Sequence, residues 1–365
     1  MRGNSFGTAF RLTTFGESHG PAIGGVVDGC PAGLKVDVAA IQHELDRRRP
    51  GSTPLGTTRK ESDAVEFLSG LLSVEGQPTT DNRQLTSLGT PIGFLIRNAD
   101  AKSEDYDHLK DTYRPGHADR TWEQKFGLRD HRGGGRSSAR ETVCRVVGGA
   151  IARQLIAQQG ISVQAYVSQV GDIIVGKPHT ELDLSAVFSS DVRCPDPTAA
   201  ERMTQAIERV RAEGDSLGGV VSCVVKGLPP GLGEPVYDRL DADLAKAMLC
   251  INATKGFQIG SGFGAATMRG SQHNAGQQGG VLGGISDGGD LFFDVAFKPP
   301  ATIARPQAST DRSGNAVTVE GTGRHDPCVV PRAVPVVEAM ACLVIADHLL
   351  RNRTSRSNNE SGRAQ

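Results

Sequence analysis

The amino-acid sequence predicts an α+β fold in which helices cover antiparallel sheets. Runs typical of strands and runs with helical periodicity are mixed along the whole chain. They do not follow the regular strand–helix alternation that is typical of a doubly wound parallel sheet. The chain has 365 residues, which is enough to bury a sizeable core.

Five runs rich in Val, Ile and Phe, bounded by Gly, Pro or Asp, have the pattern of strands. They cover residues 23–27, 92–96, 163–167, 220–225 and 291–297. Apolar residues at helical spacing predict helices over residues 139–158, 199–213, 241–251 and 334–351.

The rest of the chain divides into one folded part and a polar end. The polar stretch 75–87 has no periodicity and is predicted to be a surface loop. No composition shift marks a linker, so we expect one intertwined domain over residues 1–351. Residues 352–365 have almost nothing to bury and are predicted to form a disordered tail.

Composition excludes several classes of function. A formal charge of -1 and a pI near 6.8 argue against a surface that coats nucleic acid. The seven cysteines are scattered and form no Cys-x-x-Cys pair, which is typical of free thiols in a reducing cytosol. No apolar run approaches the length of about 18 residues that is typical of a membrane span. We therefore expect a cytoplasmic protein without nucleic-acid or membrane partners.

Three loops place a histidine near a carboxylate, with glycine or arginine beside them. They are GESHG at 16–20, RPGHAD at 114–119 and RHDPC at 324–328. Histidine gives or takes a proton near neutral pH, and a neighbouring carboxylate completes an acid–base set. A single histidine is more often a packed or surface residue, so each motif alone is a weak indication. No His-Glu-x-x-His spacing suggests a metal, and no Gly-x-Ser-x-Gly elbow suggests a hydrolase.

A glycine-rich basic segment adds a predicted anion site. The 46 glycines, nearly twice the usual frequency of about 7%, lie in separate loops, which indicates either loops that converge on a ligand or ordinary tight turns. The segment GGGRSSARE at 133–141 runs into a predicted helix, so Ser137 or Ser138 can act as its N-cap while backbone N–H groups bind an anion. The alternative is a capped helix with solvated arginines. Likewise Arg47–Arg49, followed by Arg59 and Lys60, form either a cationic site or the solvated end of a helix.

These motifs together resemble the chorismate synthase family. The stretches that carry the resemblance are TTFGESHG (13–20), LDRRRPG (45–51), RPGHAD (114–119), GGGRSSARET (133–142) and GRHDPC (323–328). They occur in the family's order, and the resemblance extends from Gly3 to about Arg351. It implies a β-α-β sandwich, a homotetramer and a lyase that converts 5-enolpyruvylshikimate 3-phosphate to chorismate with loss of phosphate. It also implies a requirement for reduced FMN without net redox change, with NADPH as a possible indirect reductant.

The resemblance assigns roles to individual residues. His19 would protonate the leaving phosphate, His117 would protonate or stabilise the reduced flavin, and Asp326 would help to remove the C6 hydrogen. The two histidine roles are interchangeable at this level. Positions that match substrate contacts are Ser18, Arg48, Arg49, Arg114, Arg140 and Arg324. Positions that match flavin contacts are Arg136, Ser137, Ser138, Asn252, Ala253, Gly284, Lys298, Pro299, Pro300, Ala301, Thr302 and Arg324.

The chain departs from the family pattern in two places. After RRRPG it has STPLG at 52–56 where many members have an arginine, so one cationic contact is either missing or supplied by Arg59 or Lys60. It has Lys298-Pro299-Pro300-Ala301-Thr302 where Lys-Pro-Thr-Ser-Ser is common, so two hydroxyl contacts to the flavin are absent. We expect an altered flavin affinity but unchanged proton-transfer residues.

Two other functions use the same residues. A flavoprotein oxidoreductase could employ the same anion-binding pocket for net electron transfer, but no nicotinamide-binding fingerprint is present. A non-catalytic anion-binding protein would use the arginines and keep the histidines as structural groups. Turnover of substrate separates the binding protein from the two enzymes.

Overall fold

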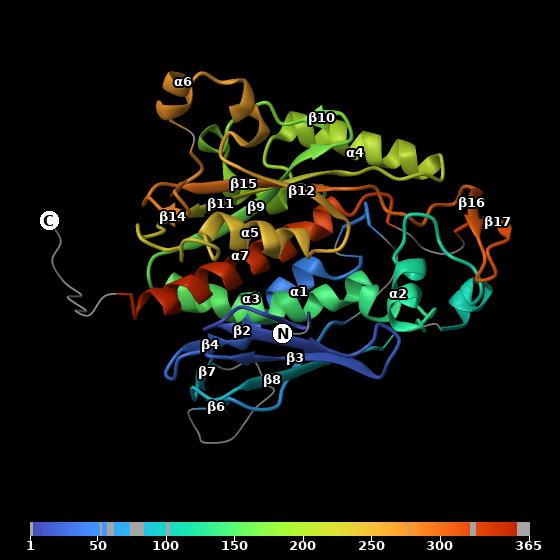
Figure 1. The fold of residues 1–365 in the computed structure, drawn as a ribbon, viewed down its shortest axis with the longest axis horizontal. Helices are drawn as coiled ribbons and strands as arrows, with labels where there is room; N and C mark the ends of the chain where they lie inside the picture. Colours follow the sequence, from blue (N-terminus) through green and yellow to red (C-terminus); the bar gives the residue numbers. More distant parts are fainter. Residues whose placement is uncertain are drawn as a thin grey trace, which may run out of the picture.

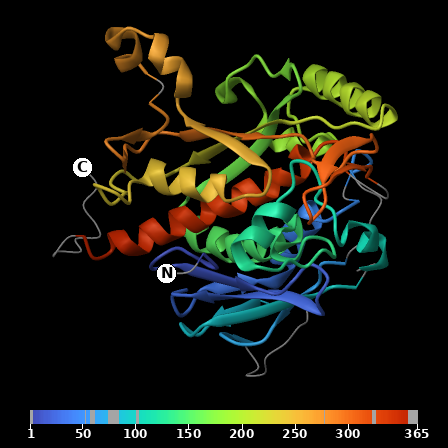
Figure 2. The same ribbon diagram turned by 45° about the vertical axis from the view of Figure 1, so that its right-hand side comes forward.

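The computed structural model describes residues 3–51, 53–56, 62–73, 84–99, 103–276, 278–321 and 326–355. It has three layers, in which one group of helices lies between two antiparallel sheets (Figure 1). The same layers are visible after rotation about the vertical axis (Figure 2). The α+β class and the β-α-β sandwich are therefore confirmed.

The first outer layer comes from the N-terminal part of the chain. Its main sheet has the order β1 (Ser5–Phe6), β2 (Arg11–Phe15), β3 (Ala22–Asp28), β8 (Ile92–Arg97) and β5 (Val65–Phe67). A smaller sheet has the order β4 (Lys35–Asp37), β7 (Gln84–Ser87) and β6 (Leu71–Ser73). The prediction of a loop over 75–87 is therefore wrong at its end, since 84–87 pairs with strands on both sides and buries Leu85. Residues 74–83 lie outside the described residues.

The second outer layer is an antiparallel sheet from the later part of the chain. Its order is β10 (Ile173–Ile174), β9 (Ser162–Val170), β11 (Gly219–Lys226), β15 (Leu291–Phe297) and β12 (Thr254–Ile259). In β15 the residues alternate, so that Leu291, Phe293, Val295 and Phe297 are buried and the residues between them are only partly buried. All five predicted strands are confirmed.

The helical layer consists of α1 (Val38–Arg48), α3 (Thr142–Ala157), α5 (Leu240–Leu249) and α7 (Val330–Asn352). α3, which contacts β3, and α7, which contacts β9 and β11, pack on each other and thereby join the two sheets. α4 (Pro197–Ala212) packs against β9 and β10 and lies outside the second sheet (Figure 1). The four predicted helices are confirmed, although the one expected from residue 139 begins with a 3-10 turn, Ala139–Glu141.

α7 is the central helix of the fold. By length and composition it could cross a membrane, with an 18-residue window of mean hydropathy 1.8. In this fold 89% of that window is buried, because helices and sheet strands surround it. An all-round apolar surface is also what a core helix requires.

Several smaller elements connect these layers or extend from them. They are α2 (Asp119–Phe126), α6 (Gly270–Asn274), β13 (Val281–Leu282), β14 (Ile285–Ser286), β16 (Gln307–Thr310) and β17 (Ala316–Val319), with a 3-10 helix at Ser103–Leu109. α3 and α7 both begin on the side where α2 lies, at the right in Figure 1. The loops that carry the sequence motifs meet on this side.

The crossing of α3 and α7 depends on Gly149. A Cβ atom there would lie 2.4 Å from both Cα and Cβ of Ala339 in α7. A Cβ at the neighbouring Gly148 would meet only the flexible end of Leu12, at 3.1 Å. Gly149→Ala is therefore expected to lower the free energy of unfolding by about 1–3 kcal/mol relative to Gly148→Ala. Both variants gain about 1 kcal/mol of helix propensity, so urea denaturation of the pair isolates the packing effect, and equal stabilities would contradict it.

Candidate active site

Asn98 joins two of the motif loops. Its side-chain amide donates to the carbonyl oxygens of Glu17 (3.1 Å) and Gly20 (2.8 Å). Its side-chain oxygen accepts a hydrogen bond from Nε of Arg140 (3.0 Å). The turn that carries Ser18 and His19 is thereby held beside the segment that begins α3.

The glycine run 133–135 brings the two histidine motifs together. All three glycines have positive φ, and a Cβ at Gly133 would lie 2.4 Å from Nε2 of His19. A Cβ at Gly134 would lie 3.2 Å from Cε1 of His117. Only glycine allows the backbone to pass this close in this conformation. His19 and His117 therefore both lie against one short loop.

The Ser18–His19 turn has further contacts at this loop. The ring of His19 meets the ring of Tyr106 edge to face, with centroids 5.1 Å apart. Oγ of Ser18 is buried and has no hydrogen-bond partner within the described residues. An unpartnered buried hydroxyl indicates a place where a bound molecule can form the missing hydrogen bond. Tyr106 was not predicted, because no motif surrounds it.

His117 belongs to a compact charged network. Its Nδ1 lies 2.8 Å from Oδ1 of Asp119, and Arg114 binds both oxygens of the same carboxylate, at 2.8 and 2.9 Å. Burial lowers the pKa of His117, the bond to Asp119 acts in the opposite direction, and the charges of Arg114 and Lys298 lower the pKa further. Because the resulting pKa lies below the ordinary value, the imidazole is neutral at pH 7.

A second network surrounds Asp63, which the sequence interpretation missed. Its buried carboxylate pairs with Nη1 of Arg140 and with Nη1 of Arg48, the latter at 3.3 Å. Arg48 also donates to the carbonyl oxygen of Ala139 (2.7 Å) and to Oγ1 of Thr142 (3.2 Å). Burial lowers the pKa of Arg48 to about 10, and Asp63 opposes that change, so the guanidinium stays charged at neutral pH. Two predicted substrate-binding arginines are thus held together.

The three arginines of the run 47–49 have different partners. Arg48 enters the Asp63 network, whereas Arg47 pairs with Glu338 of α7 (2.8 Å) and lies over the ring of Phe188 (3.9 Å). The side chain of Arg49 is 45% exposed and pairs with Asp46. The alternative of a solvated helix end therefore describes Arg49 but not the other two. Within the described residues, Arg49 makes no hydrogen bond or ion pair with the Asp63 network.

Asp326 lies at the start of α7, close to Arg48. It pairs with Arg332, whose Nε is 3.4 Å from the carbonyl oxygen of Arg48. A Cβ at Gly56 would be 3.4 Å from Oδ1 of Asp326. Arg324, which was predicted to contact both ligands, lies outside the described residues, as do Arg59 and Lys60.

Contacts link several of the residues predicted to contact the flavin to the segment that carries His117. Asn252 donates to the carbonyl oxygen of Ser137 (3.0 Å), and the carbonyl oxygen of Ala253 accepts from the backbone of Lys298 (2.9 Å). Nζ of Lys298 donates to the carbonyl oxygen of Gly116, and burial lowers the pKa of this amine. Since Gly116 precedes His117, the contacts connect the segments around 137, 252 and 298 with the histidine.

The other residues of the segment 298–302 have neighbours close to these contacts. A Cβ at Gly116 would lie 3.6 Å from Cβ of Ala301. The carbonyl oxygen of Pro300 accepts from Ser216 (2.8 Å), Pro299 lies against Gly218, and Thr302 lies against Gly321. Gly284 is the exception, because it precedes β14 at the opposite end of the molecule from α2 (Figure 1).

Arg136 and Arg140 are not solvated, contrary to the alternative reading of the glycine-rich segment. Arg136 donates to Oγ1 of Thr14 (2.7 Å), and the side chain of Arg140 is 10% exposed. Ser138 accepts from the backbone of Arg140 at 3.4 Å and so caps the 3-10 turn, as one of the two predicted serines. Ser137 instead donates to the carbonyl oxygen of Gly134 (2.7 Å).

A pocket of about 480 Å³ is lined by Arg136, Ser137 and Asn252. Trp122 and Leu343 give it apolar walls. Nη1 of Arg136 and Oδ1 of Asn252 are buried and have no hydrogen-bond partner within the described residues. A donor and an acceptor therefore remain to be satisfied beside a cavity with apolar walls.

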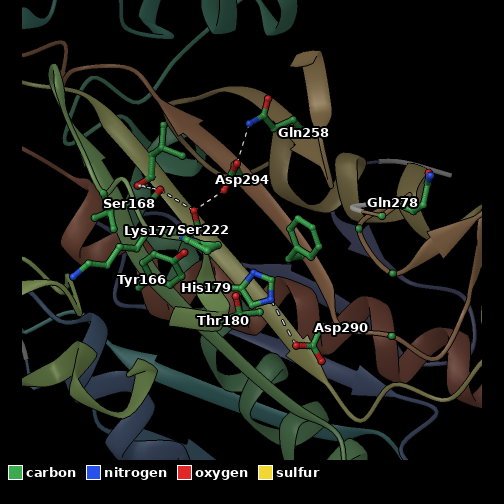
Figure 3. A pocket seen from close by; sticks show the side chains of 18 of the residues that line it. Tyr166, Ser168, Lys177, His179, Thr180, Ser222, Gln258, Gln278, Asp290 and Asp294 are labelled. Carbon is green, nitrogen blue, oxygen red and sulfur yellow. Dashed lines mark hydrogen bonds and ion pairs between the residues drawn. The ribbon is translucent and has the colours of Figure 1, made fainter. Parts of the chain in front are cut away.

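Another pocket, of about 750 Å³, lies over the second sheet (Figure 3). Ser168, Ser222, Asp294 and Gln258 form a hydrogen-bonded row across its floor. Both carboxylate oxygens of Asp294 are occupied within that row, so the row does not itself require a ligand. Of the predicted catalytic, substrate and flavin residues that the structure describes, none lines this pocket.

Comparisons with known proteins agree with the motif geometry. The chorismate synthase family model matches residues 10–350. The chorismate synthase of Christiangramia forsetii is 55% identical over 366 residues, covering 98% of this chain and 100% of the relative, and that of Chloroflexus aggregans is 53% identical over 370 residues, covering 98% of each. A crystal structure of a chorismate synthase matches with a TM-score of 0.72 at 30% identity, covering 95% of this chain and 93% of that one. The chain therefore belongs to the chorismate synthase family of carbon–oxygen lyases.

Proposed function

We propose that the chain catalyses the 1,4-elimination of phosphate and the C6 hydrogen from 5-enolpyruvylshikimate 3-phosphate, which gives chorismate. Reduced FMN is required, without net redox change. The observation that carries the proposal is the placement of both His19 and His117 against the glycine run 133–135. Two groups that exchange protons near neutral pH are thereby placed beside buried arginines.

The arginines provide the charge that the substrate requires. The substrate carries two carboxylates and a phosphate, and Arg48, Arg114 and Arg140 are each held by a buried aspartate, Asp63 or Asp119. A guanidinium has five N–H donors, so one that is oriented by an aspartate keeps donors for a substrate oxygen. Fixing the arginines before binding reduces the rearrangement required in the transition state.

Two groups handle the protons of the elimination. His19, beside Ser18 and the glycine run, donates a proton to the departing phosphate. Asp326 takes part in removing the C6 hydrogen, and its ion pair with Arg332 fixes the position of its carboxylate. His117, beside the residues that would hold the cofactor, would give or take a proton at its imidazole ring.

The residues present fit a flavin. Arg136, Ser137 and Asn252 line the pocket that has the unpartnered donor and acceptor. The remaining predicted flavin residues of this region follow them in the chain: Ser138, Ala253 and Lys298–Thr302. Reduced FMN, when bound, supplies transient electron density to the substrate. Pro300 and Ala301 provide no hydroxyl groups, so the flavin is held more by backbone and cationic contacts at this position.

The wider assignment is a cytoplasmic homotetramer that receives its reduced flavin from outside, with NADPH as the indirect reductant. All seven cysteines are free thiols, and six of them are buried, as in a reducing compartment. Gly284 directly precedes β14, which lies at the opposite end of the molecule from α2 (Figure 1). A flavin contact from Gly284 would therefore come from a second copy, which supports an oligomer.

The test is phosphate release from 5-enolpyruvylshikimate 3-phosphate under anaerobic conditions, with FMN reduced or oxidised. We expect release together with chorismate only when FMN is reduced, and no net oxidation of the flavin. Consumption of NADPH in proportion to product would instead indicate the oxidoreductase. Absence of release in both states would overturn the proposal in favour of an anion-binding protein.

A further inference from the structure

Asp119 is the residue that Arg114 and His117 both contact in the network around His117. It begins α2, is 3% exposed, and accepts hydrogen bonds from the backbone N–H of Arg114 (3.1 Å) and from the guanidinium of the same residue. Burial alone would raise the pKa of the Asp119 carboxyl, but hydrogen bonds from Arg114 and His117 hold it well below its usual range. Asp119 is therefore an anion whose orientation is set before any ligand binds.

This carboxylate determines which nitrogen of His117 carries the proton. Asp119 Oδ1 lies 2.8 Å from Nδ1, and an ionised carboxylate can only accept hydrogen bonds. Nδ1 must therefore be the donor, since its lone pair would be repelled by the carboxylate at that distance. Nη2 of Arg114 has two N–H groups; it donates one to Asp119 at 2.8 Å and lies 3.1 Å from the same nitrogen of His117. The contact of Nδ1 with the charged carboxylate is the shorter of the two, at 2.8 Å, and it decides the assignment.

The other nitrogen of His117 remains available. Nε2 makes no hydrogen bond within the part of the chain that the structure describes, and the side chain is 20% exposed. In the neutral ring with the proton on Nδ1, Nε2 carries the lone pair. It can receive a proton from a bound molecule and return it.

We propose that Asp119 is a positioning residue that keeps the proton of His117 on Nδ1 and so makes Nε2 the atom that exchanges protons. The identity of the molecule facing Nε2 rests on the proposed function, but the control of the tautomer does not. The charged groups around the ring are Asp119, which favours the imidazolium, and Arg114 and Lys298, which disfavour it. Nη1 of Arg129 lies 3.7 Å from Oδ1 of Asp119.

The test replaces the carboxylate by an amide of the same shape, as Asp119→Asn. The pKa of His117 is measured from the pH dependence of deuterium exchange at Cε1, followed by mass spectrometry of the peptide that contains it. Loss of the anion that stabilises the imidazolium is expected to shift this pKa downward. The limb of the kcat–pH profile that reports His117 should move in the same direction, and kcat should fall by at least about 10-fold, the lower end of what orienting partners of histidine ligands contribute.

Glu123→Gln is the matched control. It neutralises another carboxylate of α2, one that pairs with Arg129 (3.3 Å) and Arg312, not with His117. This variant should leave the pKa of His117 unchanged. If both variants behave alike, or if Asp119→Asn moves neither the pKa nor the pH profile, Asp119 only supports the loop and the inference is overturned.

The wild-type protein gives an independent answer if Asp119→Asn does not fold. Ring nitrogen spectra of protein labelled with ¹⁵N-histidine, assigned with His117→Ala, should show the neutral ring with its proton on Nδ1. A proton on Nε2 would overturn the inference. The deuterium exchange and the nitrogen spectra do not require turnover. A confirmed tautomer in a chain that releases no phosphate would therefore refute the proposed function and leave the role of Asp119 unchanged.

Discussion

His19→Ala is expected to lower the rate of phosphate release by about 10²–10⁴, the usual contribution of a general acid or base. His19 is held between Gly133 and the ring of Tyr106, beside the unpartnered hydroxyl of Ser18. A phosphate that leaves without a proton is a poorer leaving group, so the loss should appear in kcat. The measurement is the initial rate of phosphate release at saturating substrate with reduced FMN.

A histidine outside the site provides the control. His43 is exposed on α1, and His43→Ala should retain the full rate. Added imidazole should restore part of the rate of His19→Ala, since a small acid can enter the space that the side chain leaves beside Gly133. An unchanged rate in His19→Ala would remove this residue from the mechanism and leave His117 as the acid.

The sequence pattern was sufficient for the fold because the layers are encoded by local periodicity. β15 alternates between more and less buried residues, and α7 is apolar on all sides, so both were predicted close to their observed bounds. α7 begins at Val330, four residues before the predicted start, because Pro331 fits the first turn of a helix. β7 was missed because only Leu85 is apolar in it, and its strand depends on pairing with β4 and β6.

The site was predictable only where a motif supplied the residue. His19, His117 and the glycine run stand in recognisable local sequences, and the structure brings them together. Asp63 stands in no motif, and its importance comes from Arg140, 77 positions later in the chain. Asn98 is similar, since its role is to join two distant loops. Contacts of this kind are set by the tertiary fold, and one sequence carries no local trace of them.

Asp63→Ala is expected to lower the free energy of unfolding by about 3–5 kcal/mol, the usual effect of removing one partner of a buried ion pair. Asp63 is fully buried, and its carboxylate neutralises Arg48, which is 3% exposed, together with Arg140. Without it, two guanidinium groups remain close together with no anion between them. Urea denaturation of the wild type and the variant at the same protein concentration measures the change.

Asp46→Ala separates this effect from the loss of any aspartate–arginine pair. Asp46 pairs with Arg49 at 3.5 Å on the surface, where both side chains are more than 40% exposed. A pair of this kind contributes about 0–1 kcal/mol because water and salt screen it. If Asp63→Ala were no more destabilising than Asp46→Ala, Arg48 and Arg140 would have to find other partners. If Asp63 does neutralise the two arginines, the anionic groups of the substrate can replace it, and substrate should raise the urea midpoint of Asp63→Ala more than that of the wild type. An equal rise in both proteins would contradict this role of Asp63.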